Sequence, residues 1–184
     1  MRSALITNTA AVSMMVLTYS TSAALHTIDP WYATLINMPV GAQVFTLLLF
    51  GYWVVPGLLL GTILSYIIFP ILSHDNGLSY DAGAILVDCL APVVALYSMH
   101  LFKLASFFTA DALIIRHAAF YVLLTAFTLS TARYLFNLNK GTDDETGLLL
   151  INFAGGLIGP LVLLFIMVTV EAATKGRMKI QKTL

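Results

Sequence analysis

Six long apolar stretches constrain the fold more than any other feature of this chain. Each has about 20 residues, the length that an α-helix needs to cross the roughly 30 Å hydrocarbon core of a bilayer. The composition agrees, because 59% of the residues are hydrophobic and 10% are charged, against about 25% charged residues in soluble domains. We therefore expect an all-α polytopic membrane protein, a bundle of six transmembrane helices. The expected spans are residues 4–28, 32–50, 53–72, 80–101, 116–136 and 147–170.

The distribution of Lys and Arg predicts how these helices are oriented. With six crossings both chain ends lie on one side of the membrane, and that side collects seven of the nine basic residues. Cytoplasmic loops carry the excess of Lys and Arg, so we expect both termini in the cytoplasm. The expected transmembrane domain is residues 1–174, followed by a short basic tail, residues 175–184. The first stretch exceeds the roughly 7–15 apolar residues of a signal peptide, so we expect it to be retained.

A set of five polar residues inside the apolar stretches lies in the half of the membrane away from the cytoplasm. At 1.5 Å per residue, Asp88 lies roughly 12 Å below the outer end of its stretch and Arg133 about 5 Å below the outer end of its own. Pairing would keep both charges where a lone charge costs at least about 2.5–3.5 kcal/mol. We expect a pocket for a small ligand or a contact for a partner protein, or else simple interhelical glue. This polar set is Asn37, Gln43, Asp88, Arg133 and Asn152.

Proline and glycine predict one helix break and two packing surfaces. Pro39 has no backbone N–H and Gly41 is conformationally permissive, so we expect the second helix to kink or break near Pro39–Gly41. Small residues elsewhere let helices approach closely. They are Pro56, Gly57 and Gly61 in the third stretch, and Gly155, Gly156, Gly159 and Pro160 in the last.

This pattern resembles a known family of membrane modules. Residues 38–41 (MPVG) and 47–61 (LLLFGYWVVPGLLLG) are similar to the P-x-G, L-x-x-G and P-G-x-x-x-G signature of the first type of membrane-associated sensor domain. Residues 152–160 (NFAGGLIGP) resemble that family's closing helix, and Asp88 falls where the family tends to have a polar residue. The similar segments span most of the chain from Trp31 onward.

The resemblance implies a sensory module in a bacterial inner membrane, because the family's members precede histidine kinase or cyclic-di-GMP signalling domains. Such an output domain is missing from this sequence, which stops about 14 residues after Val170. The resemblance therefore implies that any signal passes to another protein. On this interpretation the chain is a non-catalytic subunit of a larger membrane complex.

Two other functions fit the same features. Short helices with an outer polar set are also similar to the substrate-binding subunits of energy-coupling-factor transporters, which capture a vitamin. Those subunits dock through small residues of their first helix, here Ala4, Ala10, Ala11, Ala23 and Ala24. A pigment- or haem-associated subunit is the other alternative, since imidazole can ligate haem iron. His26 and His100 lie at opposite membrane faces, so they cannot clamp one haem, and the cofactor stays unknown.

Enzymatic chemistry and nucleic-acid binding have no support in the sequence. The single cysteine, Cys89, cannot form a disulfide within the chain. The sequence contains no spacing typical of a metal site, a nucleophile elbow or a phosphate loop. A net charge of zero gives no nucleic-acid signature. We expect a non-enzyme whose partners are the lipid bilayer, a membrane or cytoplasmic protein and a small-molecule ligand.

Overall fold

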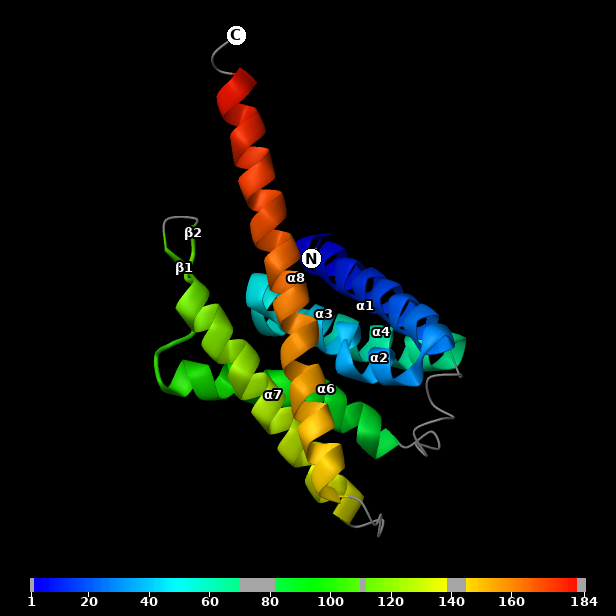
Figure 1. Ribbon diagram of the computed structural model, residues 1–184. Coiled ribbons are helices and arrows are strands. Elements are labelled where there is room, and N and C mark those ends of the chain that lie inside the picture. The colour runs from blue at the N-terminus through cyan, green and yellow to red at the C-terminus, as the bar shows by residue number, and fades with distance from the viewer. Residues whose placement is uncertain (1, 70–81, 110–111, 139–144, 182–184) are drawn as a thin grey trace.

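The computed structural model describes residues 2–69, 82–109, 112–138 and 145–181, and it is almost entirely α-helical (Figure 1). The all-α class is therefore confirmed, with one short β-hairpin as an addition. The helices are α1 (Arg2–Ile28), α2 (Pro30–Leu35), α3 (Met38–Phe50), the 3-10 helix η1 (Gly51–Val54), α4 (Val55–Ile68), α6 (Ala82–Leu101), α7 (Ile115–Leu138) and α8 (Glu145–Gln181), and the strands are β1 (Phe108–Thr109) and β2 (Ala112–Leu113).

The long helix α8 connects two groups of helices (Figure 1). It packs against α2 and α3 on one side and against α7 on the other, while α1 packs against α3 and α4. Helix α6 contacts α3, α4 and α7, so it closes the bundle opposite α1. Large apolar side chains from these helices are fully buried between them, among them Met15, Leu47, Leu58, Met99 and Leu129.

Three helical stretches in the described part of the chain are long and apolar enough to cross a membrane, which supports membrane association. They are Trp31–Ile68, which combines α2, α3, η1 and α4, and the single-helix stretches Ile115–Leu135 and Leu149–Ile166. The six expected crossings are not supported on this criterion, nor is a common side for the two termini. Ser, Thr and Asn recur along α1 and lower its hydropathy, and the apolar part of α6, Ile85–Leu101, is shorter. The expected boundaries at residues 72 and 80 lie outside the described residues.

The chain breaks before α3, as expected, but at Ile36 and Asn37 rather than within Pro39–Gly41. Helix α2 ends at Leu35, and the Asn37 side chain caps α3 by accepting a hydrogen bond from the Val40 N–H, at 3.5 Å. Pro39 therefore sits in the first turn of α3, where its missing N–H costs no hydrogen bond. The Asn37 cap thus determines where α3 begins. Pro39 is compatible with that start because it lies in the first turn of the helix.

A second break divides α3 from α4. Gly51 has φ 63° and ψ −153°, a region that is essentially restricted to glycine. The chain then turns through η1 before α4 begins. Helices α3 and α4 have 13 and 14 residues, about 20 Å each. Each is thus shorter than the hydrocarbon core that a single span must cross.

Helices α1 and α4 run parallel in close contact, because two glycines of α4 remove the side chains between them. A Cβ at Gly57 would lie 2.6 Å from the Asn8 carbonyl oxygen, and one at Gly61 would lie 2.8 Å from Met15 Cβ. Asn8 also accepts a 2.6 Å hydrogen bond from the Gly57 N–H through Oδ1. Pro56 occupies the first turn of α4. The G-x-x-x-G spacing expected to pack helices does so here.

The glycines of α8 bring that helix against the α2–α3 break. A Cβ at Gly155 would overlap the Thr34 carbonyl oxygen, and a Cβ at Gly159 would overlap the Asn37 carbonyl oxygen. A Cβ at Gly41 would lie 2.8 Å from the Gly159 carbonyl oxygen and 3.0 Å from Leu163 Cδ1, which is further along both helices. Helices α3 and α8 therefore run parallel, and the break is held against α8 by direct backbone contact.

Helix α8 is antiparallel to α7 and continues without interruption beyond the membrane-length stretch. Gly156 faces Ala126 of α7, and Pro160 is buried inside the helix. Helical structure extends to Gln181, so residues 175–181 of the expected basic tail continue α8. The rest of the tail lies outside the described residues.

The connection between α6 and α7 contains the β-hairpin. Lys103 has φ 58°, which ends the helical path after α6. Phe108 pairs with Leu113, and Thr109 pairs with Ala112, in antiparallel register. Phe107, just before β1, is buried, and its ring lies 5.5 Å from that of Tyr121 on α7. This contact ties the hairpin to the bundle.

Candidate functional site

Asp88 and Arg133 form a bidentate ion pair between α6 and α7, as predicted from the sequence. Arg133 Nε donates to Asp88 Oδ1 at 2.8 Å, and Nη2 donates to Oδ2 at 2.9 Å. The helices are antiparallel here, because Thr128, earlier on α7, donates to the Ala91 carbonyl, later on α6, at 3.2 Å. The Asp88 side chain is 8% exposed and that of Arg133 is 25% exposed. Such planar, two-bond pairs combine charge attraction with fixed geometry.

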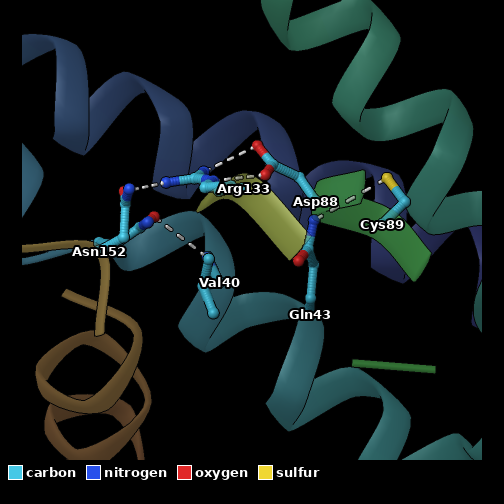
Figure 2. A network of polar contacts seen from close by, with 7 residues as sticks. Val40, Gln43, Asp88, Cys89, Arg133 and Asn152 are labelled. Carbon is cyan, nitrogen blue, oxygen red and sulfur yellow. Dashed lines mark hydrogen bonds and ion pairs between the residues drawn. The ribbon is translucent and has the colours of Figure 1, made fainter. Parts of the chain in front are cut away.

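Asn152 on α8 is the third member of this arrangement. Its Oδ1 accepts a 2.7 Å hydrogen bond from Arg133 Nη1, so the guanidinium joins α6, α7 and α8. Figure 2 shows Arg133 between Asp88 and Asn152. A guanidinium has five N–H donors, and the hydrogen bonds to described residues use three of them. Two donors therefore remain for other acceptors.

Gln43 begins a second line of polar contacts. Its Nε2 lies 3.9 Å from Cys89 Sγ, and the Cys89 thiol lies 3.3 Å from Thr62 Oγ1 on α4. All three side chains are buried, with Gln43 1% and Thr62 0% exposed. Figure 2 shows the contact between the Gln43 amide and Cys89. Together the two lines of polar contacts include residues of α8, α7, α6, α3 and α4.

A cavity of about 90 Å³ lies beside these residues. Four members of the polar set line it, and Asn152 supports Arg133 without lining it. Sequence reasoning did not place α1, α2 or α4 at this site. The complete lining is Tyr19, Ser22, His26, Ala33, Thr34, Asn37, Pro39, Val40, Gln43, Tyr66, Asp88 and Arg133.

Two residues of the cavity lining contain a buried polar atom that has no hydrogen-bond partner among the described residues. The two atoms are Ser22 Oγ and Gln43 Oε1. Ser22 is 4% exposed and Gln43 is 1% exposed, so bulk water cannot serve them in place of a partner. Rotating the Gln43 amide by 180° exchanges its oxygen and nitrogen, and an NH₂ group is then unpartnered instead. In both orientations the unpartnered group is shielded from the cavity as well as from bulk water.

The amino end of α3, at the break between α2 and α3, contributes a partial positive charge to the cavity. Asn37, Pro39 and Val40 form the amino end of α3 and line the cavity. A helix amino end carries about half a positive charge. The Val40 N–H is held only by the long 3.5 Å bond to Asn37, beyond the usual 2.7–3.2 Å. This end of the cavity therefore favours an acceptor atom.

The sequence of α1 contains a pattern that predicts its contribution to the cavity, although the helix is mostly apolar. Tyr19, Ser22 and His26 follow a spacing of three and four residues, which places them on one helix face. All three are at most 8% exposed. The ring of Tyr19 lies 5.5 Å from that of Tyr66 on α4, which forms the next part of the wall. A search for polar residues at helical spacing within α1 would have found this face.

The two histidines considered as pigment or haem ligands lie in different surroundings. His26 lines the cavity, whereas His100 is exposed and its ring lies 6.2 Å from that of Tyr52. The described residues contain no group of three or more His, Cys, Asp or Glu side chains that could hold a metal ion. A cavity of about 90 Å³ is also far below the roughly 300–1,000 Å³ of pockets for larger ligands.

Comparison with protein-family models, with curated proteins and with solved structures finds no match to this chain. The geometry of the cavity and the sequence motifs are therefore the basis for a functional proposal.

Proposed function

We propose that this chain is a non-catalytic membrane module that binds a small polar solute in the cavity beside Asp88 and Arg133. The observation that carries this proposal is the ion pair in the cavity lining, in which Arg133 keeps two N–H donors beyond its hydrogen bonds to described residues. A hydrogen bond to a charged group contributes about 1.5–3 kcal/mol. A solute that accepts from these donors therefore gains binding energy.

The cavity volume restricts the size of the solute. About 90 Å³ accommodates several water molecules or an organic molecule of a few non-hydrogen atoms. The ion pair beside it is held by α6, α7 and α8 at once, so the polar wall is formed before the solute binds. Preorganised polar groups of this kind reduce the entropy lost on binding.

For topology we propose six crossings of a bacterial inner membrane with both termini in the cytoplasm. The helix directions support this, because α1 is parallel to α4, α3 is parallel to α8, and α7 is antiparallel to both α6 and α8. Alternate crossings in chain order have these directions. The excess of Lys and Arg on the side of the termini supports the cytoplasmic assignment.

For the biological role we propose a sensor-like subunit that passes its state to a partner protein. The motifs that resemble the sensor family surround the α2–α3 break, where α8 contacts both Thr34 and Asn37. A solute in the cavity contacts this break, and α8 leads from it to the far end of the molecule (Figure 1). Mass spectrometry after mild purification separates the roles. A kinase or cyclase partner supports signalling, and a transmembrane transport partner supports the uptake alternative.

Thermal unfolding in lipid nanodiscs tests the binding proposal. A panel of polar solutes with up to about five non-hydrogen atoms is added to the wild type, to Gln43→Leu and to Thr125→Val. Thr125 Oγ1 is also buried and unpartnered among the described residues, but Thr125 does not line the cavity, so it is the matched control.

We expect at least one solute to stabilise the wild type and the control but not Gln43→Leu. At ten times the dissociation constant, the gain is about 1.4 kcal/mol. The proposal fails if no solute stabilises the wild type, or if Gln43→Leu responds equally.

A further inference from the structure

We infer that the two surfaces of a phospholipid bilayer meet this molecule at two pairs of aromatic residues, Tyr52 with Trp53 in η1 and Trp31 with Tyr32 in α2. The partner of each pair is the lipid headgroup region. This inference rests on the proposed topology only to name the inner and outer surfaces, and it does not depend on solute binding. It adds which parts of the chain lie at each surface.

All four aromatic side chains are exposed, as contact with lipid headgroups requires. The exposed fractions are 40% for Tyr52, 78% for Trp53, 52% for Trp31 and 49% for Tyr32. Tyr and Trp are enriched at both surfaces of a bilayer. Their rings have an apolar body that enters the hydrocarbon edge and an O–H or N–H that stays hydrated. Each pair therefore has the chemistry that a membrane surface favours.

Helix α1 connects the levels of the two pairs. Toward its amino end, Asn8 Nδ2 donates a 3.1 Å hydrogen bond to the Trp53 carbonyl oxygen, so η1 lies beside Asn8. At the other end, α1 stops at Ile28, and α2 follows after Asp29. The rise from Asn8 to Ile28 is about 30 Å along the helix axis. The hydrocarbon core of a bilayer is also about 30 Å thick, so the two levels match its two surfaces.

Helix α8 supports the same inner level. It runs parallel to α3, and Gly41 faces residues 159–163 of α8. The rise from Gly41 to the C-cap of α3, Gly51, is about 15 Å. The same rise from residues 159–163 brings α8 to the level of Glu171. Glu171 is the first charged residue in α8 after Glu145, so the turn at η1 is level with the end of the uncharged stretch.

The alternative is a turn inside the bilayer, because α3 and α4 are each about 20 Å long. If η1 lay at the middle of the hydrocarbon core, Asn8 beside it would lie there too. The outer end of α1 would then project about 15 Å into water, although Ile28 at that end is apolar and 76% exposed. With η1 at the inner surface, α1 fits the core. The break and α2 then fill the remaining distance of about 10 Å between α3 and the outer surface.

The same levels place the cavity in the outer half of the bilayer. Along α1, the lining residues Tyr19 and His26 lie about 14 Å and about 3 Å below Ile28. The next turns inward on α1 and α3 carry Met15 and Leu47, which are fully buried, at 0% and 1% exposed. Apolar packing therefore closes the inner side, and the proposed solute site lies beneath the outer pair of aromatic residues.

Fluorescence quenching by brominated lipids measures the depth of each pair. The chain contains two tryptophans, one in each pair. Trp31→Phe retains Trp53, and Trp53→Phe retains Trp31. Each variant is reconstituted into bilayers whose acyl chains carry bromine either near the headgroup or near the chain end.

A matched variant provides the reference for the middle of the bilayer. It is Leu17→Trp, made in the chain that also carries Trp31→Phe and Trp53→Phe. Leu17 is 67% exposed and lies about 14 Å from Asn8 along α1.

We expect bromine near the headgroup to quench both retained tryptophans more strongly than bromine near the chain end, which is a ratio above one. The Leu17→Trp reference should show a ratio below one. If bromine near the chain end quenches Trp53 more strongly, η1 lies inside the bilayer and the inference is wrong. If Trp31 shows that order, α2 lies within the hydrocarbon core and the outer assignment fails. Quenching by aqueous iodide with none by either lipid would place the pairs in water and overturn the inference as well.

Bilayer thickness provides a second measurement that needs no substitution. The unfolding free energy of the wild type should be greatest in bilayers with a hydrocarbon core of about 30 Å. A maximum at about 20 Å, the length of α3 alone, would contradict the distance between the pairs. Neither measurement involves the cavity, so a failure here leaves the solute-binding proposal standing. A failure of solute binding in the thermal unfolding test likewise leaves this inference standing.

Discussion

Replacing the two partners of the ion pair, singly and together, measures how strongly Asp88 and Arg133 are coupled. Asp88→Asn removes the charge that meets two donors of Arg133. Each charge-assisted hydrogen bond contributes about 1.5–3 kcal/mol. Arg133 is 25% exposed and keeps its bond to Asn152, so part of that loss is screened. We therefore expect a destabilisation of about 2–4 kcal/mol.

Arg133→Gln should cost at least as much. It leaves the Asp88 carboxylate without its cation, and Asp88 is only 8% exposed. Breaking a buried pair from one side costs about 3–5 kcal/mol. The same substitution also removes the donor that holds Asn152. The contact between α7 and α8 should therefore weaken along with that between α6 and α7.

The double variant gives the decisive comparison. Once both charges are gone, neither partner is left buried alone, so the loss should be smaller than the sum of the two single losses by about 1–3 kcal/mol. Unfolding in mixed detergent micelles, followed by circular dichroism, measures all three free energies. Arg116→Gln, at an exposed position on α7, controls for the change in net charge. Additivity of the single effects within about 0.5 kcal/mol would refute the coupling.

Three further predictions test the packing. Gly159→Ala should destabilise by about 1–3 kcal/mol, because its Cβ would overlap the Asn37 carbonyl oxygen; an unfolding free energy equal to the wild type's would contradict the close contact. Gly51→Ala should lower the unfolding free energy by about 1–3 kcal/mol through the backbone strain of an alanine at φ 63°, because the new Cβ meets no described side chain or backbone beyond its own neighbours within 4 Å. An unchanged unfolding free energy would exclude that strain. Cys89, which is 3% exposed, should react with a membrane-permeant maleimide only after denaturation. Fast labelling of the folded protein would show that Cys89 is accessible and would contradict its burial between Gln43 and Thr62.

Several features could be predicted because their causes are local in the chain. Apolar stretches must be helical in a bilayer, since every backbone group has to be bonded within its own segment. The break before α3 was expected from Pro39, although the capping side chain of Asn37 moved it two residues earlier. The ion pair could be predicted because a lone charge in lipid is costly, which leaves Asp88 and Arg133 few alternatives to each other.

The number of membrane-length helices could not be predicted in the same way. Residues 31–68 have the apolar character of two spans, and Gly51 and η1 divide them at the expected boundary between residues 50 and 53, but the resulting helices α3 and α4 have only 13 and 14 residues. The positive φ of Gly51 is a property of the folded backbone, and glycine only permits it.

The sequence by itself determined that the chain is helical and suited to a membrane, and it predicted that Asp88 and Arg133 lie at similar depth. Only the tertiary structure decided which helix faces meet. It placed Tyr19, Ser22 and His26 of α1 in the wall of the cavity, and it left Ser22 Oγ and Gln43 Oε1 without a hydrogen-bond partner among the described residues. The physical reason is that depth depends on position along the chain, whereas the direction of a side chain around its helix depends on the neighbours that the helix packs against.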